Sequence, residues 1–117
     1  MGAPVLHFEI HGNADSQNDF YAEIFAWKID ADNPMNYGMV DTDSGEGIAG
    51  GLTKSETAPA VMVYIQVDDL EATLAEVAAK GGSTIMPATE VPGGPTMAIF
   101  ADPSGNHIGL VKAGSMS

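Results

Sequence analysis

Polar side chains suited to ligand binding or proton transfer fall on one face of each of three predicted strands. In the stretch from Pro4 to Ile10, polar and apolar residues alternate, and side chains two positions apart in a strand share a face. The same alternation recurs in residues 61–67 and 107–112. The predicted ligand-binding set is His7, Glu9, Tyr64, Gln66 and His107. Such groups can hold a small molecule, and they can equally bond one another, so both interpretations stay open.

Three of these side chains would also suit a divalent metal ion. Two histidines and one carboxylate form a common ligand set, and His7, Glu9 and His107 supply one. Lone histidines are more often satisfied by hydrogen bonds, which weighs against this alternative. His11 follows the first predicted strand in a Gly-Asn loop, and we expect it to be exposed to solvent.

The composition excludes several classes of function. Sixteen acidic residues against four lysines and no arginine give a formal charge of −12, which repels phosphate backbones and anionic membranes. Without arginine a carboxylate or phosphate ligand has no bidentate partner, so we expect a neutral or cationic small molecule. Cysteine is absent, which excludes disulfides and thiolate chemistry. No signal peptide and no membrane-spanning run of about 18 apolar residues is recognisable, so a cytoplasmic location is expected.

The elements that position these residues occur twice in the same order. One strand, one helix and three strands are predicted within module 1, about residues 1–53, with the helix capped by Asn13 or Asp15 and ending near Ala26. A linker of about 54–59 leads to module 2, about 60–117, whose helix begins with Asp68 and Glu71 as a capping box. The predicted strands are 4–10, 27–29, 37–41, 48–52, 61–67, 83–86, 96–101 and 107–112, with 87–95 as a connection. The 117 residues fit one domain built from two modules.

The two halves also match in residues, which identifies equivalent positions. The stretch from Ser44 to Ile48 reads Ser-Gly-Glu-Gly-Ile, and the stretch from Ser104 to Ile108 reads Ser-Gly-Asn-His-Ile. The repeated order of elements makes the first and fifth strands equivalent, with His7 in the first corresponding to Tyr64 in the fifth. Ala49 in the fourth strand corresponds to Gly109 in the eighth.

The turn Asp-Pro-Ser-Gly-Asn at 102–106, the histidine in the first strand and the aromatic pair before Ala26-Trp27 together carry a family resemblance. The chain resembles the vicinal oxygen chelate superfamily, the glyoxalase, bleomycin-resistance and extradiol dioxygenase group. The resemblance implies an α+β fold in which two β-α-β-β-β modules form a curved eight-stranded mixed sheet around a cavity, with the helices on its outer face.

The resemblance also implies where a metal would bind. In metal-dependent members the first, fourth, fifth and eighth strands each supply one ligand, and the matching positions here are His7, Ala49, Tyr64 and Gly109. Only His7 is a good ligand, so we expect no metal and no other cofactor. The space beside Ala49, Gly51 and Gly109 favours a bound small organic molecule in the cavity.

Two other functions and one assembly remain as alternatives. The chain could be a metal-dependent lyase or dioxygenase with an unorthodox site around His7, Glu9 and His107. It could also be an interaction module whose cavity is filled by side chains. A homodimer, with modules exchanged through the linker, is a further hypothesis, and the sequence does not decide whether any reaction is catalysed.

Overall fold

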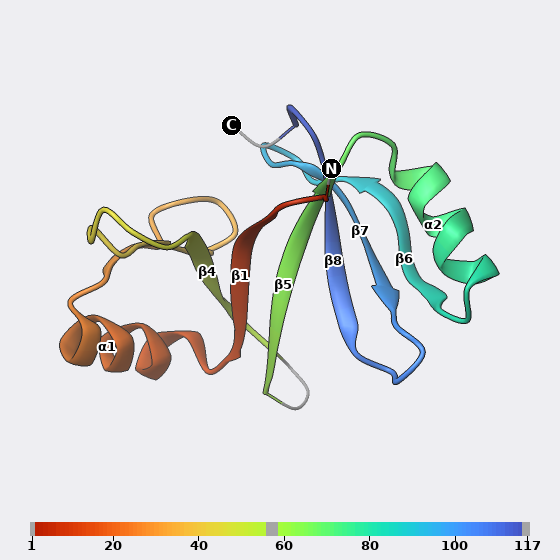
Figure 1. Ribbon diagram of the computed structural model, residues 1–117. Helices are drawn as coiled ribbons and strands as arrows, with labels where there is room; N and C mark the ends of the chain where they lie inside the picture. Colours follow the sequence, from red (N-terminus) through yellow and green to blue (C-terminus); the bar gives the residue numbers. More distant parts are fainter. Residues whose placement is uncertain (1, 56–58, 116–117) are drawn as a thin grey trace. The chain divides into compact units, whose positions relative to one another are not determined.

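The computed structural model describes residues 2–55 and 59–115, and two β-α-β-β-β modules account for its secondary structure (Figure 1). The predicted fold class is confirmed: the protein is α+β, with eight strands in a mixed sheet and two helices. Two compact units follow the modules except at their ends. One is His7–Met62, and the other is Val63–Ser117 with Met1–Leu6.

In the first module, four strands lie in the order β2-β3-β4-β1. Strands β1 and β4 are parallel, and the pairs β2/β3 and β3/β4 are antiparallel. The elements are β1 (Val5–Gly12), α1 (Ala14–Phe25), β2 (Lys28–Asp30), β3 (Gly38–Asp41) and β4 (Ala49–Lys54).

Aromatic contacts fix which face of this sheet carries α1. The rings of Phe8 and Trp27 lie 5.5 Å apart, and Trp27 stacks on Tyr21 of α1 at 5.2 Å. Val40 and Leu52 are buried, with 3% and 0% of their surface exposed. Because neighbouring strand residues point to opposite faces, His7 and Glu9 lie on the face away from α1. We call this face, with His7, Glu9 and Ala49, the distal face.

Both ends of α1 follow from local chemistry. Asn13 is the N-cap, and its side chain accepts a hydrogen bond from the backbone of Ser16 at 3.5 Å. Ala26 has φ 58 and its N–H donates to the carbonyl of Ala22, which ends the helix in a left-handed residue as predicted near this position.

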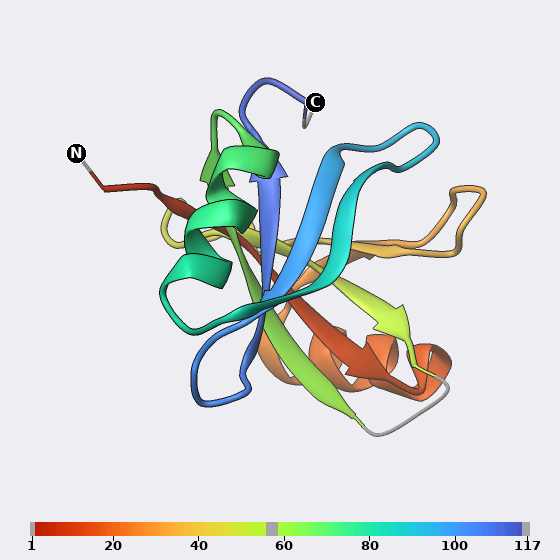
Figure 2. The same ribbon diagram turned by 90° about the vertical axis from the view of Figure 1, so that its right-hand side faces the viewer.

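The second module repeats the design with strands in the order β5-β8-β7-β6 (Figure 2). Strands β5 and β8 are parallel, and Leu74 of α2 packs in the core with Ala98 of β7 and Leu110 of β8. The elements are β5 (Ala60–Val67), α2 (Leu70–Ala79), β6 (Ser83–Glu90), β7 (Thr96–Ala101) and β8 (His107–Lys112). Within residues 2–55 and 59–115, neither helix has the length and apolarity needed to cross a membrane.

Two sequence-based predictions about this module are wrong in detail. The N-cap of α2 is Asp69, which accepts from the backbone of Ala72 at 3.0 Å, and not Asp68. The sixth strand continues past Met86 through Pro87 to Glu90, where a loop was predicted. Strand β6 pairs with β7 alone and its register shifts between Met86 and Thr89, which are the conditions under which a strand tolerates proline.

The turn before β8 is held by one carboxylate. Asp102 Oδ1 accepts hydrogen bonds from the backbone N–H groups of Ser104 and Asn106, both at 2.9 Å, and Oδ2 accepts from the Asn106 amide. Gly105 has φ 92, which favours glycine. The bond from the Asn106 side chain, and then the backbone bonds, lower the pKa of Asp102. The predicted turn therefore forms and sets the start of β8.

Candidate functional site

A chain of hydrogen bonds on the distal face links two of the predicted site residues. The hydroxyl of Tyr37 lies 2.9 Å from Nε2 of His7 and donates to Oε2 of Glu9 at 2.8 Å. The other carboxylate oxygen of Glu9 lies 2.6 Å from Nε2 of His11. We call this set, His7, Tyr37, Glu9 and His11, the polar chain.

The direction of these bonds defines the state of His7. The single proton of the Tyr37 hydroxyl goes to the Glu9 carboxylate, so the tyrosine oxygen accepts from Nε2–H of His7. His7 is only 6% exposed, and this burial lowers its pKa, although the charge of Glu9 opposes the shift. In this arrangement Nε2 of His7 carries the proton of its bond to Tyr37, and burial favours the neutral imidazole.

Tyr37 reaches this position because a glycine lies beneath it. Gly51 on β4 pairs with Glu9 on β1 and with Met39 on β3, and a Cβ at Gly51 would collide with the Tyr37 hydroxyl. The expected empty space beside this glycine is therefore filled by the tyrosine. A ring also covers Gly109, because its strand partner Tyr64 packs directly over it. The prediction that Gly51 and Gly109 leave space is wrong for both positions.

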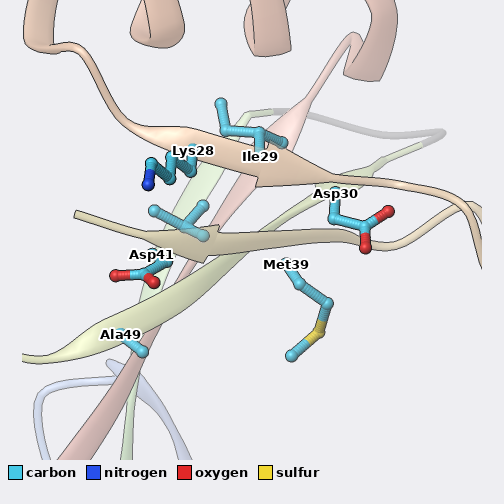
Figure 3. Close-up of a pocket in the computed structure, with 7 residues that line it drawn as sticks. Lys28, Ile29, Asp30, Met39, Asp41 and Ala49 are labelled. Atoms are coloured by element: carbon cyan, nitrogen blue, oxygen red, sulfur yellow. The ribbon is translucent and has the colours of Figure 1, made fainter. Parts of the chain in front are cut away.

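A groove of about 500 Å³ lies on the first module (Figure 3). Ala49, which pairs with His7 across β4 and β1, contributes to it, and so does Met39, which pairs with Gly51. Figure 3 shows the Met39 side chain pointing to the opposite side of the sheet from Ile29. The lining is Lys28, Ile29, Asp30, Met39, Val40, Asp41 and Ala49.

The charged groups at the groove are mostly acidic. Asp30 and Asp41 contribute carboxylates, and Lys28 forms an ion pair with Asp43 at 3.0 Å. The pKa of Lys28 is raised, first by its hydrogen bond to Asp43 and then by the charge of that carboxylate. The groove therefore combines an apolar surface with an acidic rim.

The remaining predicted site residues lie in the second module. Tyr64 is buried, with 5% of its surface exposed, and Gln66 on the same strand is half-buried. His107 is exposed at the start of β8. A ligand-binding role for Tyr64, Gln66 and His107 stays a prediction.

Sequence reasoning missed Tyr37 and misplaced His11. Tyr37 precedes Met39 by two residues and so shares its face, a periodicity visible in the sequence. Its contact with His7 depends on Gly51 of the neighbouring strand β4, which is distant in sequence. His11 was expected to be exposed beyond the first strand. Strand β1 instead continues to Gly12, and the half-buried His11 side chain binds Glu9.

The residues present do not fit the metal centre that the resemblance implies. Its four positions form two strand pairs, His7 with Ala49 and Tyr64 with Gly109, and Ala49 and Gly109 have no donor atom. Nε2 of His7 is bonded to Tyr37. In the part of the chain that the structure describes, no three His, Cys, Asp or Glu side chains are grouped to hold a metal ion. The structure gives no support to the alternative centre around His7, Glu9 and His107.

Comparison with known proteins gives concordant matches in sequence and in fold. The family model described as Glyoxalase/Bleomycin resistance protein/Dioxygenase superfamily matches residues 7–110. A protein of Mycobacterium bovis, provisionally named glyoxylase CFP32, is 34% identical over 103 residues. That alignment covers 80% of this chain and 39% of the relative, so the chain spans about two fifths of the length of this relative.

Solved structures share the fold at low sequence identity. Methylmalonyl-CoA epimerase from Mycobacterium tuberculosis has a TM-score of 0.68 and 15% identity, over 92% of this chain and 86% of that one. The 2,2',3-trihydroxybiphenyl 1,2-dioxygenase from Sphingomonas wittichii has a TM-score of 0.68 and 17% identity, over 100% of this chain and 43% of that one. Because one fold supports these two different activities, the similarity defines the architecture and not the reaction.

Proposed function

This chain belongs to the glyoxalase/bleomycin resistance protein/dioxygenase superfamily, and on that premise we propose that it binds a small organic molecule, neutral or cationic, without a resident metal ion. The observation that carries the proposal is the groove of about 500 Å³ on the first module. Its volume is in the range of about 300–1,000 Å³ typical of small-molecule sites.

The lining supports both the size and the charge of the proposed ligand. Met39 and Ala49 offer apolar contacts, and the flexible thioether of methionine adapts to ligands of different shape. Asp30 and Asp41 would attract a positive charge or accept hydrogen bonds from a neutral donor. The cation in the lining, Lys28, is already paired with Asp43, which leaves the rim unfavourable for an anion.

The polar chain would orient the ligand at the side of the groove. Ala49 is the strand partner of His7, so a molecule over Ala49 lies next to that part of the distal face. His7, Tyr37 and Glu9 hold one another in place, and their hydrogen bonds fix the positions of their oxygen and nitrogen atoms. Tyr64, Gln66 and His107 are proposed as further ligand contacts.

Two fluorescent probes with nearly the same aromatic skeleton test the proposal. N-phenyl-1-naphthylamine is neutral, and 8-anilinonaphthalene-1-sulfonate carries a sulfonate. We expect saturable fluorescence enhancement with the neutral probe and weaker binding of the sulfonate at low salt, because the rim is acidic. Equal or stronger binding of the sulfonate would contradict the proposed ligand charge.

A substitution in the groove shows whether the probe binds there. We expect Ala49→Leu to weaken binding of the neutral probe by about tenfold, the effect of losing roughly 1.4 kcal/mol of contact in a filled groove. The matched control is Ala88→Leu, the same change at an exposed position on β6. If both variants bind the neutral probe as the unmodified chain does, the groove is not the site.

A further inference from the structure

We infer that Tyr37 takes the place of a metal ion in the first module, and that the polar chain makes the distal face a hydrogen-bonding site in which His7 is a proton donor to Tyr37 and not a ligand. His7 matches the position of a metal ligand in the resembled family, and its hydrogen bond to Tyr37 gives it a different role that does not depend on ligand binding in the groove. It rests on three features of the described residues: the bonds of Tyr37, the glycine beneath it and the burial of His7.

The hydroxyl of Tyr37 is bonded to one of the two ring nitrogens of His7 through which an imidazole can bind a metal. An imidazole binds a metal through the lone pair of a deprotonated ring nitrogen. Nε2 of His7 lies 2.9 Å from the Tyr37 hydroxyl and carries the proton in that bond, since the hydroxyl proton points to Glu9. A metal at Nε2 would have to displace the hydroxyl and release the proton.

The path of the tyrosine across the sheet depends on one residue. Tyr37 precedes β3, its hydroxyl lies over Gly51 of β4, and its partners are His7 and Glu9 of β1. Any side chain at Gly51 would collide with the hydroxyl. With glycine at position 51, the Tyr37 side chain can extend from the start of β3 across β4 to β1.

The strand partner of His7 cannot act as a second metal ligand. A second ligand opposite His7 would come from Ala49, whose methyl group cannot coordinate, and the groove begins at that residue. Glu9, the nearest carboxylate on the same strand face, is held by Tyr37 and His11. Both carboxylate oxygens of Glu9 are thus engaged in hydrogen bonds.

The tautomer of His7 is the first test, measured by nitrogen-15 NMR of the labelled full chain near pH 7.5. The expected result is a neutral ring protonated at Nε2, with that resonance shifted in Tyr37→Phe, which removes only the hydroxyl. Tyr21→Phe, in the aromatic cluster on α1, is the control and should leave the His7 signals unchanged. A neutral His7 protonated at Nδ1 in the unmodified chain would overturn the inference.

Zinc binding is the second test and needs no knowledge of the organic ligand. Ala49→His places a donor opposite His7, yet the hydroxyl of Tyr37 should still compete for Nε2. We therefore expect Ala49→His with Tyr37→Phe to bind Zn²⁺ about tenfold more tightly than Ala49→His alone, because no hydrogen bond to Tyr37 then competes for Nε2 of His7. Equal zinc affinity of the two proteins would show that the Tyr37 hydroxyl does not compete with zinc for Nε2 of His7. The proposed role of Tyr37 would then be wrong, whether or not the groove binds the neutral probe.

Discussion

At the scale of single residues, the burial of His7 ties protein stability to pH. In the unfolded chain an imidazole takes up a proton near its ordinary pKa of 6.5. In the folded chain burial lowers that pKa, so His7 remains neutral to lower pH. The unfolded state then binds more protons as pH falls through 6.5, and linkage requires the folded state to lose stability there.

His7→Gln should remove this component of the pH dependence. We expect the stability difference between the unmodified chain and His7→Gln to shrink as pH falls from about 7.5 to 5, by at most about 1.4 kcal/mol per pH unit. Urea unfolding at several pH values measures it. A constant difference for His7→Gln would mean that His7 is not the group responsible.

At the scale of elements, the strand and helix order was predictable because periodicity and turn residues are local signals. The alternation of Leu6, His7 and Phe8 already separates the two faces of β1. What local patterns could not predict is contact between distant segments. Tyr37 reaches His7 only because β4 lies between β3 and β1 and carries Gly51, a fact of sheet order and not of spacing.

The other errors have equally physical causes. The proline and glycine content of residues 87–95 predicts a connection from Pro87 onward, but β6 is an edge strand with irregular pairing and accommodates Pro87. The cap of α2 was placed one residue early because Asp68 and Asp69 are adjacent and both can accept an N-cap bond. The geometry alone selects Asp69.

Because Asp69 is the N-cap of α2, we predict that replacing Asp69 destabilises the protein more than replacing Asp68. Asp69→Ala should lower the free energy of unfolding by about 1 kcal/mol, because the backbone N–H of Ala72 loses its partner. Asp68→Ala removes the same charge one residue earlier and should change stability by less than about 0.5 kcal/mol. Urea unfolding of both variants at neutral pH gives the comparison, and equal losses would place the cap elsewhere.

At the scale of the whole molecule, the sequence match defines the family and the shared fold defines the architecture. The match over residues 7–110 and the folds shared with an epimerase and a dioxygenase define the architecture. At two strand pairs of this chain, His7 lies opposite Ala49 and Tyr64 covers Gly109. We propose that this chain binds an organic ligand beside a tyrosine-centred hydrogen-bond network, at the position where the family resemblance implies a metal.

Native mass spectrometry of the chain purified without chelator, with metal content measured on the same sample, tests this claim most directly. We predict a mass increment from an organic molecule that is lost on unfolding and reduced in Ala49→Leu, together with less than one equivalent of metal. One divalent ion retained per chain, absent from His7→Ala and accompanied by no organic mass, would contradict the account.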